Sequence, residues 1–178
     1  ASNVVIGHSA LGADQKGARN VAVGNSALGL QVLTSNTETK NVGIGMFAGY
    51  NNVTGVNNVY VGYAAGNGAT DQSNSNNTAV GFDALKAITT GGTNVAIGYY
   101  AGSDITNSTA NTLMGSYAGE VTTGDDNVFL GAYAGRYAGK DSTVLHCVAI
   151  GRDAFRGASS GTRPSGDYNI AIGSYALD

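Results

Sequence analysis

Hydrophobic positions along this chain recur in one short motif. The motif reads Asn, an apolar residue, any residue, an apolar residue, Gly, two free positions, Ala, and then Gly or Leu. Ten copies span residues 1–178, and their anchor glycines lie 16 to 22 residues apart, with a mean of about 18. The anchors are Gly7, Gly24, Gly45, Gly62, Gly81, Gly98, Gly115, Gly131, Gly151 and Gly173. Such a period predicts a single stacked array. Because both chain ends lie inside the pattern, we interpret it as a segment of a longer fibre or adhesin.

Within each copy, the apolar positions alternate with the two-residue period of a strand. Val95 and Ile97 flank one residue, and we expect flanking side chains of this kind to point into a core. The Gly that follows predicts a tight corner, and the Ala three residues later predicts a site where only a methyl group fits. A coil of this length has room for two short strands and two turns. The pattern therefore predicts an all-β fold, a parallel β-roll or β-helix solenoid of about ten coils, roughly 48 Å long.

Asn opens nine of the ten copies, and Cys147 replaces it in the other one. In a stack of coils, equal positions align in columns, and a column of amides can form a hydrogen-bonded ladder. We expect each Asn to donate to the next coil and to accept from the previous one, which is a structural role. The column consists of Asn3, Asn20, Asn41, Asn58, Asn77, Asn94, Asn111, Asn127 and Asn169.

The position between the two flanking apolar residues never carries a polar side chain. By alternation it is expected to face away from the interior of its own coil. A long apolar column exposed to water requires a cover, and we expect a second copy of the chain to supply it in a closed homo-oligomer. The alternative is a longer loop that folds back over the same face. The residues predicted at this interface are Ala22, Tyr60, Ala79, Ala96, Leu113, Phe129, Ala149 and Ala171, with Val5 and Gly43 at the same position.

Composition excludes several functional classes. Nine Lys and Arg stand against twelve Asp and Glu, and no basic run is present, so nothing predicts a nucleic-acid partner. A single cysteine cannot form a disulfide within the chain. No apolar run approaches 18 residues, so the sequence predicts no membrane span, and no signal peptide is visible.

The core Asn94-Val95-Ala96-Ile97-Gly98, with its near repeat at residues 169–173, resembles the head repeat of YadA-like trimeric autotransporter adhesins. It is also similar to arrays in phage tail fibres, where the same core is followed by Tyr-x-Ala-Gly and a Thr-Thr-Gly loop. The resemblance covers all ten copies. It implies a left-handed parallel β-roll that forms a homotrimer on a cell surface or virion and attaches to a host cell, matrix or glycan. The repeat here is longer than the adhesin repeat, which is nearer 14 residues.

Aromatic residues are frequent at the two positions after each anchor glycine. An exposed column of this kind offers flat faces on which a sugar ring can stack, with a hydroxyl at the edge. The alternative is that the same rings pack between subunits. The candidate binding residues are Tyr63, Tyr99, Tyr100, Tyr117, Tyr133 and Tyr175, and Phe47 and Phe82 occupy the same positions.

Other candidate chemistry is sparse, and we expect no cofactor and no metal. Asp125 and Asp126 form an acidic pair without a calcium-loop series around it. His8 and His146 lie too many coils apart to share an ion with Cys147 within one chain. No paired carboxylates recur at coil spacing, as glycoside hydrolysis needs, and no Gly-x-Ser-x-Gly elbow is present, so we predict no enzyme activity.

Two functions remain open from the sequence. The first is a non-enzymatic surface attachment module, contacting a host cell or glycan through tyrosines and through the loops at residues 30–40, 67–76 and 156–168. The second is a structural shaft that presents a receptor-binding tip outside this sequence. A flat ice-binding array is disfavoured because the threonines gather in loops of unequal length.

Overall fold

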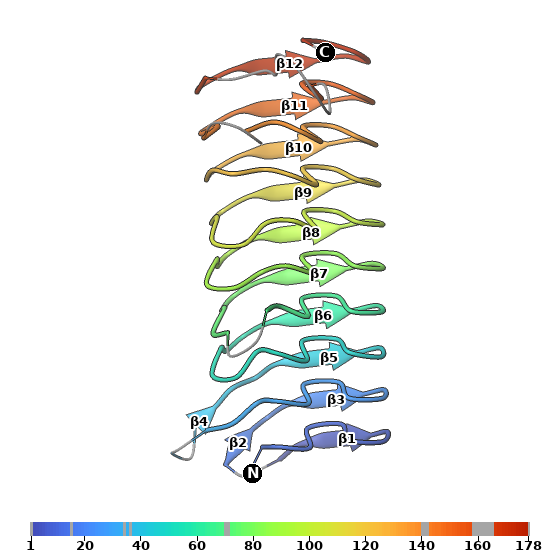
Figure 1. Cartoon of the computed structure of the whole chain (residues 1–178), viewed down its shortest axis with the longest axis vertical. Coiled ribbons are helices and arrows are strands. Elements are labelled where there is room, and N and C mark those ends of the chain that lie inside the picture. The colour runs from blue at the N-terminus through green and yellow to red at the C-terminus, as the bar shows by residue number, and fades with distance from the viewer. Residues whose placement is uncertain are drawn as a thin grey trace.

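Ten three-residue strands stack into one parallel sheet along the whole length of the molecule (Figure 1). The computed structural model describes residues 2–14, 16–33, 35, 37–69, 72–139, 143–157 and 166–177. The strands are β1 (Val4–Ile6), β3 (Val21–Val23), β5 (Val42–Ile44), β6 (Val59–Val61), β7 (Thr78–Val80), β8 (Val95–Ile97), β9 (Thr112–Met114), β10 (Val128–Leu130), β11 (Val148–Ile150) and β12 (Ile170–Ile172). A small separate sheet pairs β2 (Gly17–Ala18) with β4 (Thr37–Glu38). The described chain contains no helix, and the predicted all-β solenoid is confirmed.

Each strand pairs with the equivalent strand of the next repeat, in register. Ala96 of β8 lies beside Leu113 of β9, for example, and Val95 lies beside Thr112. The same parallel pairing joins each repeat to the next one from β1 to β12. Equal positions of the repeat therefore form continuous columns, as the sequence predicts.

The anchor glycines form the tightest of these columns. Their φ angles lie between 124° and 143°, a region that side chains with a Cβ rarely adopt. A Cβ on Gly98 would overlap the carbonyl group of Gly115 in the next coil. Both the turn and the close stacking of coils therefore require glycine at this position.

The segment after each anchor glycine is a series of turns and not a second strand, so the expectation of two strands per coil is wrong. Residues two and four places after the anchor adopt left-handed conformations, as Tyr100 (φ 56°) and Gly102 (φ 58°) do. This alternation is incompatible with an extended strand. Backbone hydrogen bonds still join the coils there, from Gly102 N–H to the Ala118 carbonyl and from Tyr100 N–H to the Phe82 carbonyl, both 2.9 Å.

The middle residue of each strand points into the coil, which reverses the predicted direction of the pleat. The proposed interface residues Ala22, Tyr60, Ala79, Ala96, Leu113, Phe129, Ala149 and Ala171 are all 0–2% exposed within a single chain. They pack with the Ala column, from Ala10 to Ala154, in one continuous core. The coil is too thin to hold two inward side chains per strand, so it takes the single middle one. These residues are therefore core residues and cannot form a contact between chains.

Large and small side chains complement each other inside this thin core. Where the middle strand residue is large, the fourth residue after the anchor is Gly: a Cβ on Gly66 would overlap the Tyr60 ring. Where the strand residue is small, as Ala79 is, the turn position carries a buried Leu85 instead. In these coils one side chain fills the space, from either the strand or the turn. The coil with Ala96 and Gly102 is small at both positions, and Leu85 and Leu113 of the neighbouring coils reach toward Gly102.

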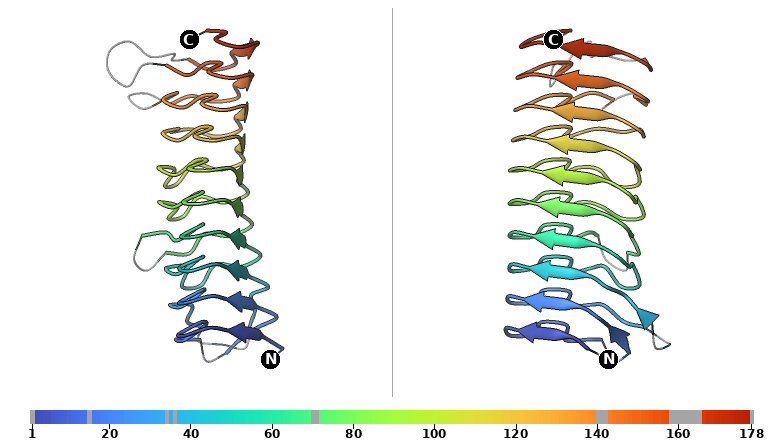
Figure 2. Two further views of the ribbon diagram at one scale, coloured as in Figure 1. Left: turned by 90° about the vertical axis from the view of Figure 1, so that its right-hand side faces the viewer. Right: turned by 180° about the vertical axis from the view of Figure 1, so that it is seen from behind.

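The residues that flank the middle position point outward and form a flat surface, which we call the outer face. Eighteen of its twenty residues are apolar, and the other two are Thr78 and Thr112. Its first column is Val4, Val21, Val42, Val59, Thr78, Val95, Thr112, Val128, Val148 and Ile170; its second is Ile6, Val23, Ile44, Val61, Val80, Ile97, Met114, Leu130, Ile150 and Ile172. Figure 2 shows the strands along one side of the molecule, with the described loops extending away from it. The sequence left open the alternative that a longer loop folds back over the apolar face. No described loop covers the outer face.

The Asn column forms a ladder at the entrance to the strands. The backbone N–H of Asn111 donates to Asn94 Oδ1 (3.0 Å), and the Asn111 side-chain amide donates to the same oxygen (3.2 Å) and to the Gly124 carbonyl (3.0 Å). The amide thus donates to the next coil, as expected, but the side-chain oxygen accepts from the following coil and not from the previous one. The contacts lie within the stack, so the column has a structural role.

Candidate functional site

An aromatic column follows the turns at the edge of the sheet. Ring centroids of Tyr63 and Phe82 are 4.9 Å apart, and the stack continues from Phe82 to Tyr99 at 5.5 Å. From Tyr99 the contacts pass to Tyr100, 4.6 Å away. The coil spacing brings Tyr63, Phe82 and Tyr99 together because each directly follows the anchor glycine in successive repeats.

The column then continues toward the C-terminal coils at the second position after the anchor. Tyr100 stacks on Tyr117 and Tyr117 on Tyr133, each with a centroid separation of 5.4 Å and interplanar angles of 17° and 7°. Arg136 lies over this part of the column, 4.4 Å from the Tyr117 centroid and 5.2 Å from that of Tyr133. Of the six predicted tyrosines, five thus form one contiguous column, and Tyr175 lies apart from it.

The rings are available to a partner to different degrees. Tyr63, Tyr99 and Tyr175 are 43%, 48% and 56% exposed, whereas Tyr100 and Tyr117 are half-buried in the stack. Tyrosine hydroxyls are protonated at neutral pH and can donate hydrogen bonds, and partial burial raises the pKa of both Tyr100 and Tyr117 further. The column thus combines flat apolar faces with hydroxyl donors, the surface that sugars favour.

Two coils carry a buried aspartate at the position where other coils carry tyrosine. Asp83 pairs with Lys86 at 2.8 Å, and Asp153 pairs with Arg156 at 3.2 Å, in each case three residues along the chain. Both carboxylates are at most 3% exposed. The hydrogen bond from Lys86 to Asp83 raises the pKa of the Lys86 amine, which keeps this cation charged. Each pair adjoins a depression in the surface.

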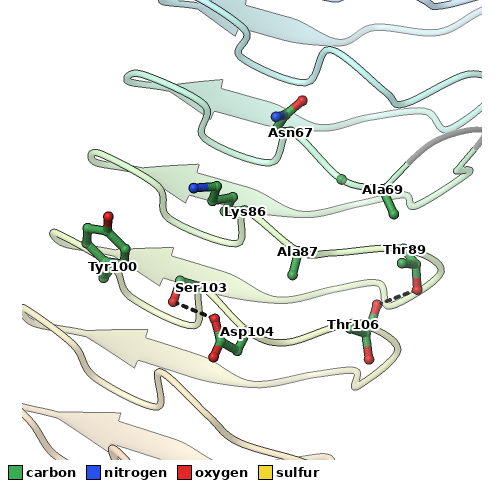
Figure 3. A pocket seen from close by; sticks show the side chains of 10 residues that line it. Asn67, Ala69, Lys86, Ala87, Thr89, Tyr100, Ser103, Asp104 and Thr106 are labelled. Carbon is green, nitrogen blue, oxygen red and sulfur yellow. Dashed lines mark hydrogen bonds between the residues drawn. The ribbon is translucent and has the colours of Figure 1, made fainter.

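The larger depression, of about 460 Å³, crosses three successive coils and is shown in Figure 3. Lys86 and Asp104 project from equivalent return segments, and Tyr100 closes the end nearest the turn. At the other end Thr89 Oγ1 donates to the Thr106 carbonyl at 2.9 Å. Hydroxyl, amine and carboxylate groups here surround small methyl side chains, an arrangement that can bind a polar, uncharged ligand.

The smaller depression, of about 270 Å³, is rich in cations. Its lining consists of Tyr133, Arg136, Arg152, Asp153, Arg156 and Tyr175. Arg152 Nε and Arg156 Nη1 each lie 3.2 Å from an oxygen of Asp153. Arg136 binds Glu120 of the preceding coil. Burial would lower the pKa of the Arg136 guanidinium, but the hydrogen bond and charge of Glu120 outweigh burial and raise it.

The acidic and metal-type candidates have structural partners. Asp125 Oδ1 accepts from the Thr109 backbone N–H at 2.7 Å, which holds the loops of two coils together. His146 stacks on Tyr168 and lies 3.7 Å from Asp126. Among the residues that the structure describes, no three His, Cys, Asp or Glu side chains gather as metal ligands would. Within the same residues there is no helix with the length and hydropathy to cross a membrane.

The three predicted contact loops are only partly described. In the loop at 67–76, Asn52 bridges to Gln72 and Asn74 is buried beneath the surface. The loop at 30–40 contains β4. Most of the loop at 156–168, namely residues 158–165, lies outside the described residues.

The cationic depression was missed by sequence reasoning. A usable signal exists, because the segments Asp83-Ala84-Leu85-Lys86 and Asp153-Ala154-Phe155-Arg156 repeat one pattern of acid, Ala, large apolar residue and base. In both cases an acid occupies the second position after the anchor glycine, where other coils carry tyrosine, and a base lies three residues later.

No protein-family model, no curated protein and no solved structure matches this chain.

Proposed function

We propose that this chain is a non-enzymatic segment of an extracellular attachment fibre, on a cell surface or virion, and that three copies assemble through their outer faces. The outer face is the observation that carries this proposal. It is about 43 Å long and 10 Å wide, or roughly 430 Å², from the strand spacing and the rise per residue. The largest apolar patch on a monomeric protein typically measures about 300–600 Å² and is often functional, and the outer face falls in this range.

The chemistry of the outer face favours another copy of the same chain as its cover. Both columns repeat at the strand spacing, so an identical face matches them in period over the full length of the rod. Neither column contains a charged residue. Three narrow faces can close around one axis, which hides all of them and leaves no open edge of the assembly. The resemblance of residues 94–98 to trimeric adhesin and fibre repeats supports the same number of copies.

This assembly leaves the aromatic column on the outside. The column follows the turns at the edge of the sheet and not the outer face itself, so each ring is presented three times around the fibre. Weak contacts repeated in this way sum to firm attachment through avidity. A rod of uniform coils would also serve as a structural shaft. Binding of the rod itself to a cell or a glycan would distinguish the attachment function from the shaft.

Sedimentation equilibrium of the native chain tests the assembly. We expect three times the chain mass of 17.8 kDa at micromolar concentration. Val95→Lys and Val128→Lys place charges in the centre of the outer face and should yield monomers, because a buried unpaired charge is costly. Asn107→Lys, in an exposed loop, is the matched control and should remain assembled.

A native chain that sediments as a folded monomer would overturn the proposed assembly, and a dimer would overturn the number of copies. Attachment is tested with the assembled protein on cells and a glycan array. Tyr100, Tyr117 and Tyr133 changed together to Ala should reduce binding while the mass stays constant. Absence of binding by an intact assembled rod would favour the shaft.

A further inference from the structure

The tyrosine column lacks one rung in the coil of β11. Tyr133 in the coil before and Tyr175 in the coil after occupy the second position following the anchor glycine, and Asp153 occupies it between them. Two coil spacings place the rings about 9.6 Å apart along the stack. The depression of about 270 Å³ lies at this gap, with one ring at each side.

Arginine side chains surround the gap. Arg152 and Arg156 are held by the Asp153 carboxylate, which is only 3% exposed, while their own side chains are 65% and 37% exposed. Arg156 also lies over the Tyr133 ring, 5.7 Å from its centroid. Asp153 thus acts as a buried anchor that fixes two guanidinium groups at the rim.

The donors at this site outnumber the acceptors that hold them. Two arginines carry ten N–H groups, and one carboxylate accepts about four hydrogen bonds. Arg152 and Arg156 also outnumber Asp153 in charge, whereas Arg136 of the lining is paired with Glu120 of the preceding coil. The gap therefore has an excess of positive charge and of hydrogen-bond donors, which favours an anionic ligand.

We propose that this gap, which we call the arginine slot, binds a sugar that bears a carboxylate, such as a hexuronic acid residue of a glycan. The planar guanidinium groups of Arg152 and Arg156 match a carboxylate with paired hydrogen bonds. Tyr133 and Tyr175 provide faces for the sugar ring. A slot of this volume suits one ring. The inference deepens the proposed attachment function, on which it rests, by naming the class of ligand.

Nuclear magnetic resonance titration of the native protein with three probes tests the assignment. D-glucuronate carries both carboxylate and ring, D-glucose carries the ring alone, and acetate carries the carboxylate alone. We expect glucuronate to shift the side-chain signals of Arg152 and Arg156 and to bind at least about ten-fold more tightly than either other probe. Equal binding of acetate and glucuronate would overturn the sugar assignment, and absence of glucuronate binding would overturn the slot.

Two variants separate the slot from the general charge of the protein. Asp153→Tyr inserts the missing rung and should abolish binding with little effect on folding, because tyrosine already occupies this position in neighbouring coils. Arg156→Gln should weaken glucuronate binding at least about ten-fold. Arg19→Gln, which alters a surface pair with Glu38 far along the rod, is the control and should bind normally. Unchanged binding by Asp153→Tyr would refute the proposal.

Sedimentation of the same samples keeps the two proposals distinguishable. Asp153→Tyr should assemble as the native chain does, because the slot lies on the turn edge and not on the outer face. Assembly without glucuronate binding would contradict the slot alone. Glucuronate binding by a monomeric chain would contradict the trimer alone.

Discussion

The ring of Phe129 lies over Gly135, in the place where a Cβ on that glycine would stand. In five other coils the turn residue equivalent to Gly135 is Leu or Phe. In four of these coils the strand residue equivalent to Phe129 is Ala. The two positions share one volume in a core that is one side chain thick. Neither can be changed alone without creating an overlap or a cavity.

This relationship predicts strong coupling between the two positions. Gly135→Leu should destabilise the fold by about 3 kcal/mol through overpacking, and Phe129→Ala should do so by about 3–5 kcal/mol through a cavity. The double variant copies the arrangement of Ala79 and Leu85. Its loss of stability should be at least about 2 kcal/mol smaller than the sum of the losses in the two single variants. Chemical denaturation of all four proteins measures this coupling. Additive effects would show that the positions do not share a volume.

The anchor glycines should tolerate no side chain. Gly98→Ala introduces a Cβ against the Gly115 carbonyl at a φ of 143°, and we expect a loss of about 3 kcal/mol or more. Gly12→Ala, at a glycine without a positive φ, is the comparison and should change stability by less than about 1 kcal/mol. Thermal unfolding of both variants measures the difference. Similar melting temperatures would contradict the stacked-glycine account.

Cys147 is the weak rung of the Asn ladder. Its sulfur accepts from the Asn169 backbone N–H at 3.4 Å, where other coils have an amide oxygen at about 3.0 Å. Cys147→Asn should raise stability by about 1 kcal/mol, because sulfur is a weak acceptor and Asn fits every other rung. Cys147→Ala removes the acceptor and should lower stability. A melting temperature for Cys147→Asn at or below that of the native chain would contradict the ladder's contribution.

Tyr60 should make the fold sensitive to alkali. Burial raises the pKa of its phenol, whose hydroxyl donates to Asn74 within the core. Below about pH 10 both the folded and unfolded chains keep this proton, and above it only the unfolded chain releases it. The free energy of unfolding should then fall by up to about 1.4 kcal/mol per pH unit from this group.

Denaturation between pH 8 and pH 11 tests the role of Tyr60. Tyr60→Phe should be less stable at pH 8, through loss of the hydrogen bond to Asn74, and should lose less stability as the pH rises. Tyr168→Phe, at a side chain that is 75% exposed, is the matched control. An unchanged alkaline slope in Tyr60→Phe would contradict the prediction.

Much of the fold follows from the sequence because the repeat is regular. Asn94 and Gly98 define the period and the corner of a coil, and they predict the stack and the parallel sheet correctly. The direction of the pleat does not follow from alternation, since apolar residues occupy both faces of each strand. The decisive signal is the size relation between positions six residues apart, such as Phe129 and Gly135.

The candidate site was predicted less completely. The tyrosines between Tyr63 and Tyr133 follow from the two positions after the anchor glycine, and the structure brings them into contact. The arginine slot depends on how Asp153 interrupts that column and on side chains from three coils. Sequence position alone does not show that Arg136 and Arg152 line one depression.

Methyl resonances of isoleucine in the assembled protein, recorded with a soluble paramagnetic agent, test the central claim most directly. Ile44 and Ile150 of the outer face are 40% and 38% exposed in one chain, whereas Ile88 in the core is fully buried. If copies of the chain meet through the outer face, the Ile44 and Ile150 methyl signals will be as well protected from the agent as that of Ile88. Strong broadening of Ile44 and Ile150, with Ile88 unaffected, would show that water covers this face and would contradict the account.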